Sequence, residues 1–172
     1  DFIVVDGAEG GTGAAPLEFS NHVGAPLQEG LQLVHNTLVG LNLRERIRIG
    51  CAGKVVSAFD VARAIALGAD WCNSARGFMF ALGCIQALRC HANTCPAGVT
   101  THNPRLQRGL VVADKAERVA NYCRNMNKEI DMIAHSCGLR QAREFRREHV
   151  RIVQGFGQSI AFNMLYPYPV VR

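Results

Sequence analysis

The sequence has 172 residues, of which 48% are hydrophobic and 19% are charged, with a formal net charge of +5. This is an ordinary soluble globular composition, with enough apolar side chain for one substantial core. No apolar run is long enough to span a bilayer, and no signal peptide is evident, so we expect a cytoplasmic protein without a membrane partner.

Much of the positive charge lies near the C-terminus, where five arginines between Arg140 and Arg151 are interleaved with Glu144 and Glu148. This interleaving predicts an exposed helix face. Nucleic-acid binding would need a larger surface of one sign with aromatic or groove-reading residues, so we expect no nucleic-acid partner.

The first part of the chain alternates between strand-like and helix-like segments. A continuous apolar run at 2–5 predicts a strand buried on both faces, and further strands are predicted at 47–51 and 70–74. Apolar residues at helical spacing lie between the first two strands, from Leu27 to Leu41.

A second helix is predicted between the second and third strands. It follows Ser57, which forms a capping-box signal with Asp60, and it stops at Gly68. Strands that alternate with helices in this way predict right-handed βαβ units and a parallel sheet.

The pattern becomes mainly helical after residue 100. A helix-start signal at 114–117 is followed by apolar residues at helical spacing as far as Cys137, and Gly138 ends the run. The segment 155–172 has no clear period. We therefore divide the chain into a βα part at 1–104 and a mainly helical extension at 105–172.

Three loops that follow the strands are candidate ligand sites, because ligands of βα proteins bind at the carboxyl ends of the strands. The first holds Gly10, Gly11, Thr12 and Gly13, more glycine than a tight turn needs, and its spacing is not that of a dinucleotide fingerprint. Gly and basic residues recur in the next two loops, which favours a phosphate site there. These residues are Gly53, Lys54, Ser74, Ala75, Arg76 and Gly77.

Three cysteines, Cys84, Cys90 and Cys95, lie within twelve residues, and Pro96 follows the last. Thiolates are the usual ligands of iron–sulfur clusters, and three would suit a cluster that lacks one iron corner. Zinc with a nearby histidine is an alternative, although the close Cys-x-x-Cys pair is missing. Three unrelated buried thiols are the third interpretation. The other four cysteines are interpreted as buried structural thiols.

Read together, these segments resemble the FMN-binding domain of glutamate synthase. The markers are Asp6-Gly7 with Gly10-Gly11-Thr12-Gly13-Ala14-Ala15-Pro16, then Ala81-Leu82-Gly83-Cys84, and the triplet that ends in Cys95-Pro96-Ala97-Gly98-Val99-Thr100-Thr101. The resemblance implies a (β/α)₈ TIM barrel of which this chain is the C-terminal part, since a whole barrel needs about 250 residues. The three strands would then be the last three of the barrel.

The resemblance also implies the cofactors and the reaction. FMN would be held by the three loops, and Cys84, Cys90 and Cys95 would bind a [3Fe-4S] cluster that passes electrons to the flavin. The enzyme would form L-glutamate from 2-oxoglutarate and ammonia, or glutamine-derived ammonia, with ferredoxin or an NAD(P)H-linked subunit as electron donor. The isolated chain is expected to be inactive and to self-associate.

Two other functions remain open at this point. Another FMN-dependent barrel oxidoreductase, such as a 2-hydroxy-acid oxidase, would explain the loops but would leave the three cysteines without a role. A non-catalytic iron–sulfur subunit, acting in electron transfer or as a scaffold, would keep the cluster and would have lost catalysis.

Overall fold

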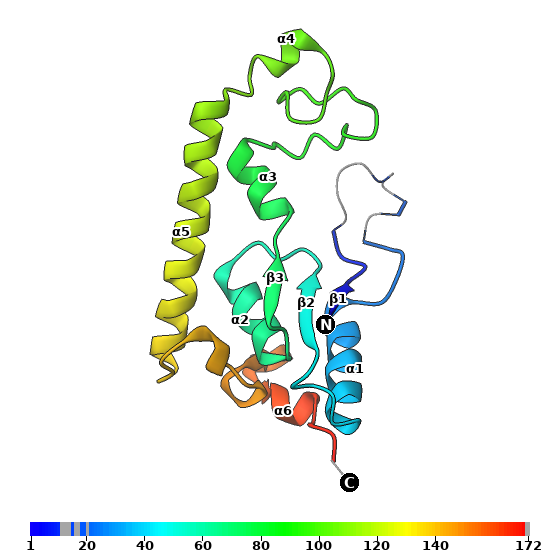
Figure 1. Ribbon diagram of the computed structural model, residues 1–172, viewed down its shortest axis with the longest axis vertical. Helices are drawn as coiled ribbons and strands as arrows, with labels where there is room; N and C mark the ends of the chain where they lie inside the picture. The colour runs from blue at the N-terminus through cyan, green and yellow to red at the C-terminus, as the bar shows by residue number, and fades with distance from the viewer. Residues whose placement is uncertain (11–14, 16–17, 20, 171–172) are drawn as a thin grey trace.

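The computed structural model describes residues 1–10, 15, 18–19 and 21–170. Three βα units come first, and a long helix and a short antiparallel hairpin follow (Figure 1). The elements are β1 (Phe2–Asp6), α1 (Leu27–Gly40), β2 (Arg48–Ala52), α2 (Ala58–Ala66), β3 (Trp71–Asn73), α3 (Arg76–Leu82), α4 (Pro104–Gln107), α5 (Val112–Ser136), the 3₁₀ turns η1 (Ala142–Glu144), η2 (Arg147–His149) and η3 (Gly155–Gly157), β4 (Arg151–Val153), β5 (Ser159–Ala161) and α6 (Phe162–Leu165).

The three predicted strands form the parallel sheet that the sequence predicted, in the order β1-β2-β3. Each strand lies within about one residue of its predicted position. Because the strands are parallel, their carboxyl ends at Asp6, Ala52 and Asn73 all lie at one edge of the sheet, and the three candidate loops leave from that edge (Figure 1).

The two faces of the sheet differ in what covers them. Ile49 and Cys51 point toward the helices and are fully buried in a core that includes Leu31. On the other face Phe2 is 67% exposed and Val4 is 44% exposed. Since side chains alternate along a strand, the face away from the helices is apolar but open.

Local signals explain the ends of α2. The Ser57 hydroxyl accepts from the Asp60 amide, and the Asp60 carboxylate accepts from the Ser57 amide, so the predicted capping box is present. After the helix, Gly68 adopts a left-handed conformation with φ of 115°, as a helix C-terminus favours.

The chain after residue 104 is mainly helical in its first part, and its later part has only the short helix α6. Helix α5 packs along α2 and α3, and it begins at Val112, two residues before the predicted start signal at Asp114. The predicted helix face at 140–151 is wrong: this segment forms two 3₁₀ turns and the start of the β4–β5 hairpin. Phe162 of α6 is buried in the same core as Leu31, so the last residues close the amino end of the sheet.

Candidate functional site

The first two strand-end loops are joined directly. The Gly7 amide donates to the Ala52 carbonyl at 2.8 Å, which extends the β1–β2 pairing one residue past the strands. The Glu9 carboxylate accepts from the Leu27 amide at 2.8 and 3.1 Å, so it caps the amino end of α1. Glu9 therefore fixes the return of the first loop to its helix, a role that no local pattern in the sequence indicated.

Gly10 is the point where all three loops meet. It has φ of 96°, which favours glycine, and its amide donates to Asn21 Oδ1 at 2.8 Å. A Cβ built on Gly10 would lie 3.5 Å from the Lys54 backbone nitrogen. The Arg76 guanidinium donates to the Gly10 carbonyl at 3.4 Å. Two cationic residues from the second and third loops thus border the first loop.

Gly11, Thr12 and Gly13 lie outside the described residues. Gly53 follows β2 in the second loop with φ of 146°. The described part of the site therefore consists of Gly10, Gly53, Lys54 and the segment 74–77.

Helix α5 supports the third loop. The Ser74 hydroxyl donates to the Val55 carbonyl at 2.8 Å, and the Tyr122 hydroxyl of α5 donates to the Val56 carbonyl at 2.6 Å. A Cβ on Gly77 would collide with the Tyr122 hydroxyl and ring. The close packing of α5 therefore requires glycine at position 77. This packing accounts for Gly77 without a role in ligand binding.

The amino end of α3 has the features of an anion site. Ala75 is its N-cap residue, and among the described residues no side chain caps the helix. Its first-turn N–H groups, with Lys54 and Arg76 nearby, match what a phosphate group needs. Lys54, Arg76 and these N–H groups could therefore hold a phosphate group such as that of FMN.

The three candidate cluster ligands lie in the loop between α3 and α4. Cys84 directly follows Gly83, the left-handed C-cap of α3, and its sulfur accepts from the Gln86 amide at 3.4 Å. Cys90 is half-buried, and Cys95 is only 7% exposed. Within the described residues no group of three or more His, Cys, Asp or Glu side chains is arranged to hold a metal. The sulfurs would have to converge for a cluster to bind.

Donor groups gather around Cys95. Burial works against its thiolate, but contacts with the Thr100 amide and hydroxyl and with the Val99 and Ala97 amides outweigh burial and lower the pKa of Cys95 to about 7. None of these contacts has the geometry of a full hydrogen bond, and Thr100 Oγ1 is buried without a partner among the described residues. A metal-bound thiolate is ionised and accepts such donors, so this set fits a cluster ligand.

The remaining cysteines divide into two pairs. Cys51 and Cys72 face each other across β2 and β3 with their sulfurs 3.4 Å apart, and Cys51 is fully buried, as predicted. Cys123 and Cys137 are exposed, so the prediction that they are buried is wrong. Cys123 lies on α5, and Cys137 is the residue that follows the end of this helix.

The chain is similar to known proteins in both sequence and fold. Residues 1–140 match the family described as a conserved region in glutamate synthase. A glutamate synthase large subunit-like protein of Bacillus subtilis, YerD, is 45% identical over 150 residues, which are 87% of this chain and 29% of that protein. The archaeal NADPH glutamate synthase of Methanocaldococcus jannaschii is 36% identical over 152 residues, 88% of this chain and 30% of that protein.

The match covers most of this chain but only part of each relative. The chain spans less than a third of the length of either relative. Among solved structures, a flavocytochrome b2 variant with pyruvate bound superposes with a TM-score of 0.51 at 17% identity, covering 99% of this chain and 36% of that one. At this identity the likeness concerns the fold alone. Among the described residues, no helix has the length and apolar character needed to cross a membrane.

Proposed function

Because the chain belongs to the family defined by the conserved region of glutamate synthase, we propose that it is the C-terminal part of a glutamate-forming FMN and iron–sulfur enzyme. The observation that carries the proposal is the meeting of three strand-end loops at Gly10, with Lys54 and Arg76 beside it. This is the edge where (β/α)₈ barrels bind ligands and where phosphate groups find backbone amides.

The residues of this chain have separate roles in the proposal. Lys54, Arg76 and the amides of 75–77 would hold the FMN phosphate, and Tyr122 would fix the third loop in place from behind. Cys84, Cys90 and Cys95 would bind a [3Fe-4S] cluster. When bound, FMN supplies hydride transfer and the cluster supplies single electrons.

The proposed reaction of the intact protein is the reductive formation of L-glutamate from 2-oxoglutarate and ammonia, the latter free or derived from glutamine. The proposed electron donor is ferredoxin or an NAD(P)H-linked subunit. Relatives of both kinds occur: the Methanocaldococcus jannaschii protein is an NADPH glutamate synthase, and that of Cyanidium caldarium is a ferredoxin-dependent glutamate synthase, so both donors stay in the proposal.

The test uses the intact protein, purified without oxygen, and measures FMN per chain and glutamate formation. Replacing Lys54 and Arg76 together, as Lys54→Gln with Arg76→Gln, removes two charges from the phosphate end. We expect FMN affinity to fall about tenfold or more, at about 1.4 kcal/mol for each tenfold change.

The matched control is Arg108→Gln, which removes an exposed arginine after α4, away from these loops. It should retain FMN. Normal FMN binding by the double variant would contradict the proposed cofactor site. An intact protein that binds FMN but forms no glutamate from 2-oxoglutarate and ammonia would contradict the proposed reaction.

A further inference from the structure

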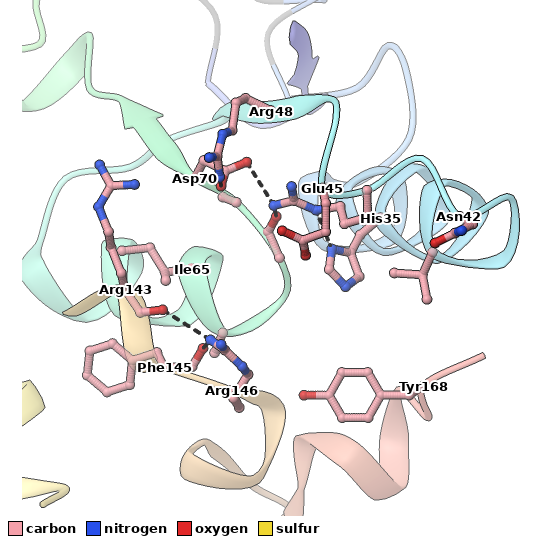
Figure 2. Close-up of a pocket in the computed structure, with 15 residues that line it drawn as sticks. His35, Asn42, Glu45, Arg48, Ile65, Asp70, Arg143, Phe145, Arg146 and Tyr168 are labelled. Atoms are coloured by element: carbon pink, nitrogen blue, oxygen red, sulfur yellow. Dashed lines mark hydrogen bonds and ion pairs between the residues drawn. The ribbon is translucent and has the colours of Figure 1, made fainter. Parts of the chain in front are cut away.

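A cavity lies near the amino ends of β2 and β3, at the edge of the sheet opposite the three strand-end loops. Its volume is about 520 Å³, a size typical of small-molecule sites (Figure 2). It is bordered by the carboxyl ends of α1 and α2, by the 3₁₀ turn η1 and by Tyr168. The three cofactor loops leave from the other edge, so this cavity is separate from the proposed flavin site (Figure 1).

One wall of the cavity is a closed polar network. Arg44 donates to Asp70 at 2.8 Å, to the Gly68 and Ile47 carbonyls, and from Nε to His35 Nδ1 at 3.2 Å. Asp70 also accepts from Arg48 and from the Ile49 amide. All three Arg44 nitrogens and both Asp70 oxygens have partners, so this pair is structural.

The other polar groups of the cavity are not satisfied in this way. Among the described residues, no acceptor contacts the Arg143 guanidinium, and Arg146 uses only Nη1, toward the Arg143 and Phe145 carbonyls. His35 Nδ1 accepts from Arg44, so its proton lies on Nε2, and Figure 2 shows that nitrogen turned away from Arg44 into the open space. Among the described residues, the Arg143 guanidinium and the other nitrogens of the Arg146 guanidinium therefore have no acceptor.

The charge of the cavity is positive. Four arginines, Arg44, Arg48, Arg143 and Arg146, line it, against the carboxylates of Asp70 and Glu45. Burial, and then the charges of Arg44 and of Arg147, lower the pKa of His35 to about 4. His35 is therefore neutral near pH 7, and its depressed pKa reflects its burial first and the neighbouring arginine charges second. Arg147 is 0% exposed and pairs with carbonyls, Asn36 and the Tyr168 ring, with no carboxylate among them.

The cavity also has apolar and aromatic walls. Val39, Ile65, Phe145 and the ring of Tyr168 border it, and the Tyr168 hydroxyl points toward the side of Arg146 in Figure 2. Such apolar walls suit a ligand that has an organic group as well as a negative charge. Planar guanidinium groups bind phosphate through two parallel hydrogen bonds, which a spherical ion such as chloride cannot use.

We propose that this cavity binds a small organic phosphate, with Arg143 and Arg146 on the phosphate and His35 Nε2 as a further donor. Glu45 is the one carboxylate of the cavity that is without a partner among the described residues, and it would face the ligand's polar organic part. The site is separate from the three cofactor loops and does not depend on flavin binding.

Calorimetric titration of the intact protein in phosphate-free buffer tests the proposal, with adenosine monophosphate, inorganic phosphate and succinate as probes. We expect the nucleotide and phosphate to bind and to compete. Arg143→Gln should weaken both about tenfold, the loss of one charge-assisted contact. Arg143→Lys keeps the charge but loses the planar pair of N–H donors. Its affinity for both probes should lie between that of Arg143→Gln and that of the unchanged protein. The Arg143 side chain makes no hydrogen bond or ion pair in the described chain, so these variants should fold normally.

The control is Arg105→Gln, an exposed arginine on α4 at the far end of the molecule (Figure 1). It should bind both probes as the unchanged protein does, and all variants should keep the same FMN content. Equal affinity in Arg143→Gln and the unchanged protein would overturn the site. Binding of succinate without phosphate would overturn the ligand class, and absence of binding by all three probes would overturn the proposal.

Discussion

Cys95 differs from the other cysteines in the groups around it. The amide and hydroxyl of Thr100, with the Val99 and Ala97 amides, favour its thiolate, and the Thr100 hydroxyl has no other partner in the described chain. Hydrogen bonds to a cluster's sulfur ligands are among the factors that set its reduction potential. The segment after Cys95 is held in turn by Thr101, whose hydroxyl donates to the Asn93 carbonyl at 2.9 Å. The groups around Cys95 therefore favour its thiolate form, which a cluster ligand needs.

The first prediction concerns these ligands. In the intact protein purified without oxygen, Cys84→Ser, Cys90→Ser and Cys95→Ser should each lose most of the iron and of the visible cluster absorbance. A hydroxyl is a poor replacement for a soft thiolate. Cys123→Ser is the control, because Cys123 is an exposed cysteine on α5. Iron content that is normal in all three variants would remove the cluster assignment.

His35 gives a prediction about pH. Its pKa is about 4 in the folded chain, below the ordinary 6.5, so the unfolded chain takes up a proton first as the pH falls. The stability that neutral His35 contributes is complete above pH 6.5 and is lost between pH 6.5 and 4. From pH 7 to pH 5 the expected loss is about 2 kcal/mol.

Urea unfolding of the intact protein at the two pH values measures this loss. His35→Gln keeps an acceptor for Arg44 but cannot be protonated, so its stability should fall less over the same interval. His22→Gln, at an exposed position, should behave like the unchanged protein. If the stability of His35→Gln and of the unchanged protein depended on pH in the same way, the pKa of His35 would not be lowered in the folded chain.

Among the elements, α5 has a role beyond covering the sheet. Tyr122 reaches past α3 to the Val56 carbonyl and stacks edge-on against Phe78, with ring centroids 5.0 Å apart. Gly77 lies directly beneath its hydroxyl. The long helix is thus connected to the second and third strand-end loops, and changes in its position would be felt at the proposed phosphate site.

A paired substitution tests this connection. Gly77→Ala should destabilise the intact protein by about 1–3 kcal/mol, because the new methyl group collides with Tyr122. Adding Tyr122→Leu should recover part of that loss, so the two effects should not be additive. Gly155→Ala is the control, since a Cβ there meets nothing within 4 Å. If FMN content and stability both recover in the double variant, the role of Gly77 is in packing. Additive effects of the two substitutions on stability would refute the contact between Gly77 and Tyr122.

The same elements explain what the sequence could and could not predict. The capping box at Ser57 and the glycine at Gly68 are local signals, and α2 has the predicted ends. The segment 140–151 was misread because its interleaved charges fit a helix face, whereas Phe145 and Arg147 are buried by contacts with residues distant in sequence. The role of Tyr122 had no local signal, because its partners are distant in sequence. Val56 is 66 residues away and Ser74 is 48 residues away.

At the scale of the whole molecule, the chain contains three parallel strands of a fold that has eight. In a closed barrel the face that carries Phe2, Val4 and Trp71 would point inward, against side chains from the other strands. Phe2 and Trp71 already pack edge-on, with ring centroids 5.7 Å apart, but nothing in the described chain covers them further. The open face is continuous with β1 and β3, whose outer edges are unpaired in the three-stranded sheet.

The final prediction follows for these 172 residues produced alone. Open strand edges and an exposed apolar face favour self-association, and a flavin would lack every contact from the missing strands. We therefore expect a colourless oligomer on size-exclusion chromatography, without FMN, cluster or glutamate synthase activity. Replacing the exposed residues of the open face, as Phe2→Ser with Val4→Ser, should shift the chain toward the monomer. Leu33→Ser, on the exposed side of α1, should leave the elution unchanged. A yellow-brown monomer with bound flavin would instead mean that three strands suffice for cofactor binding and that closure of the barrel is not required.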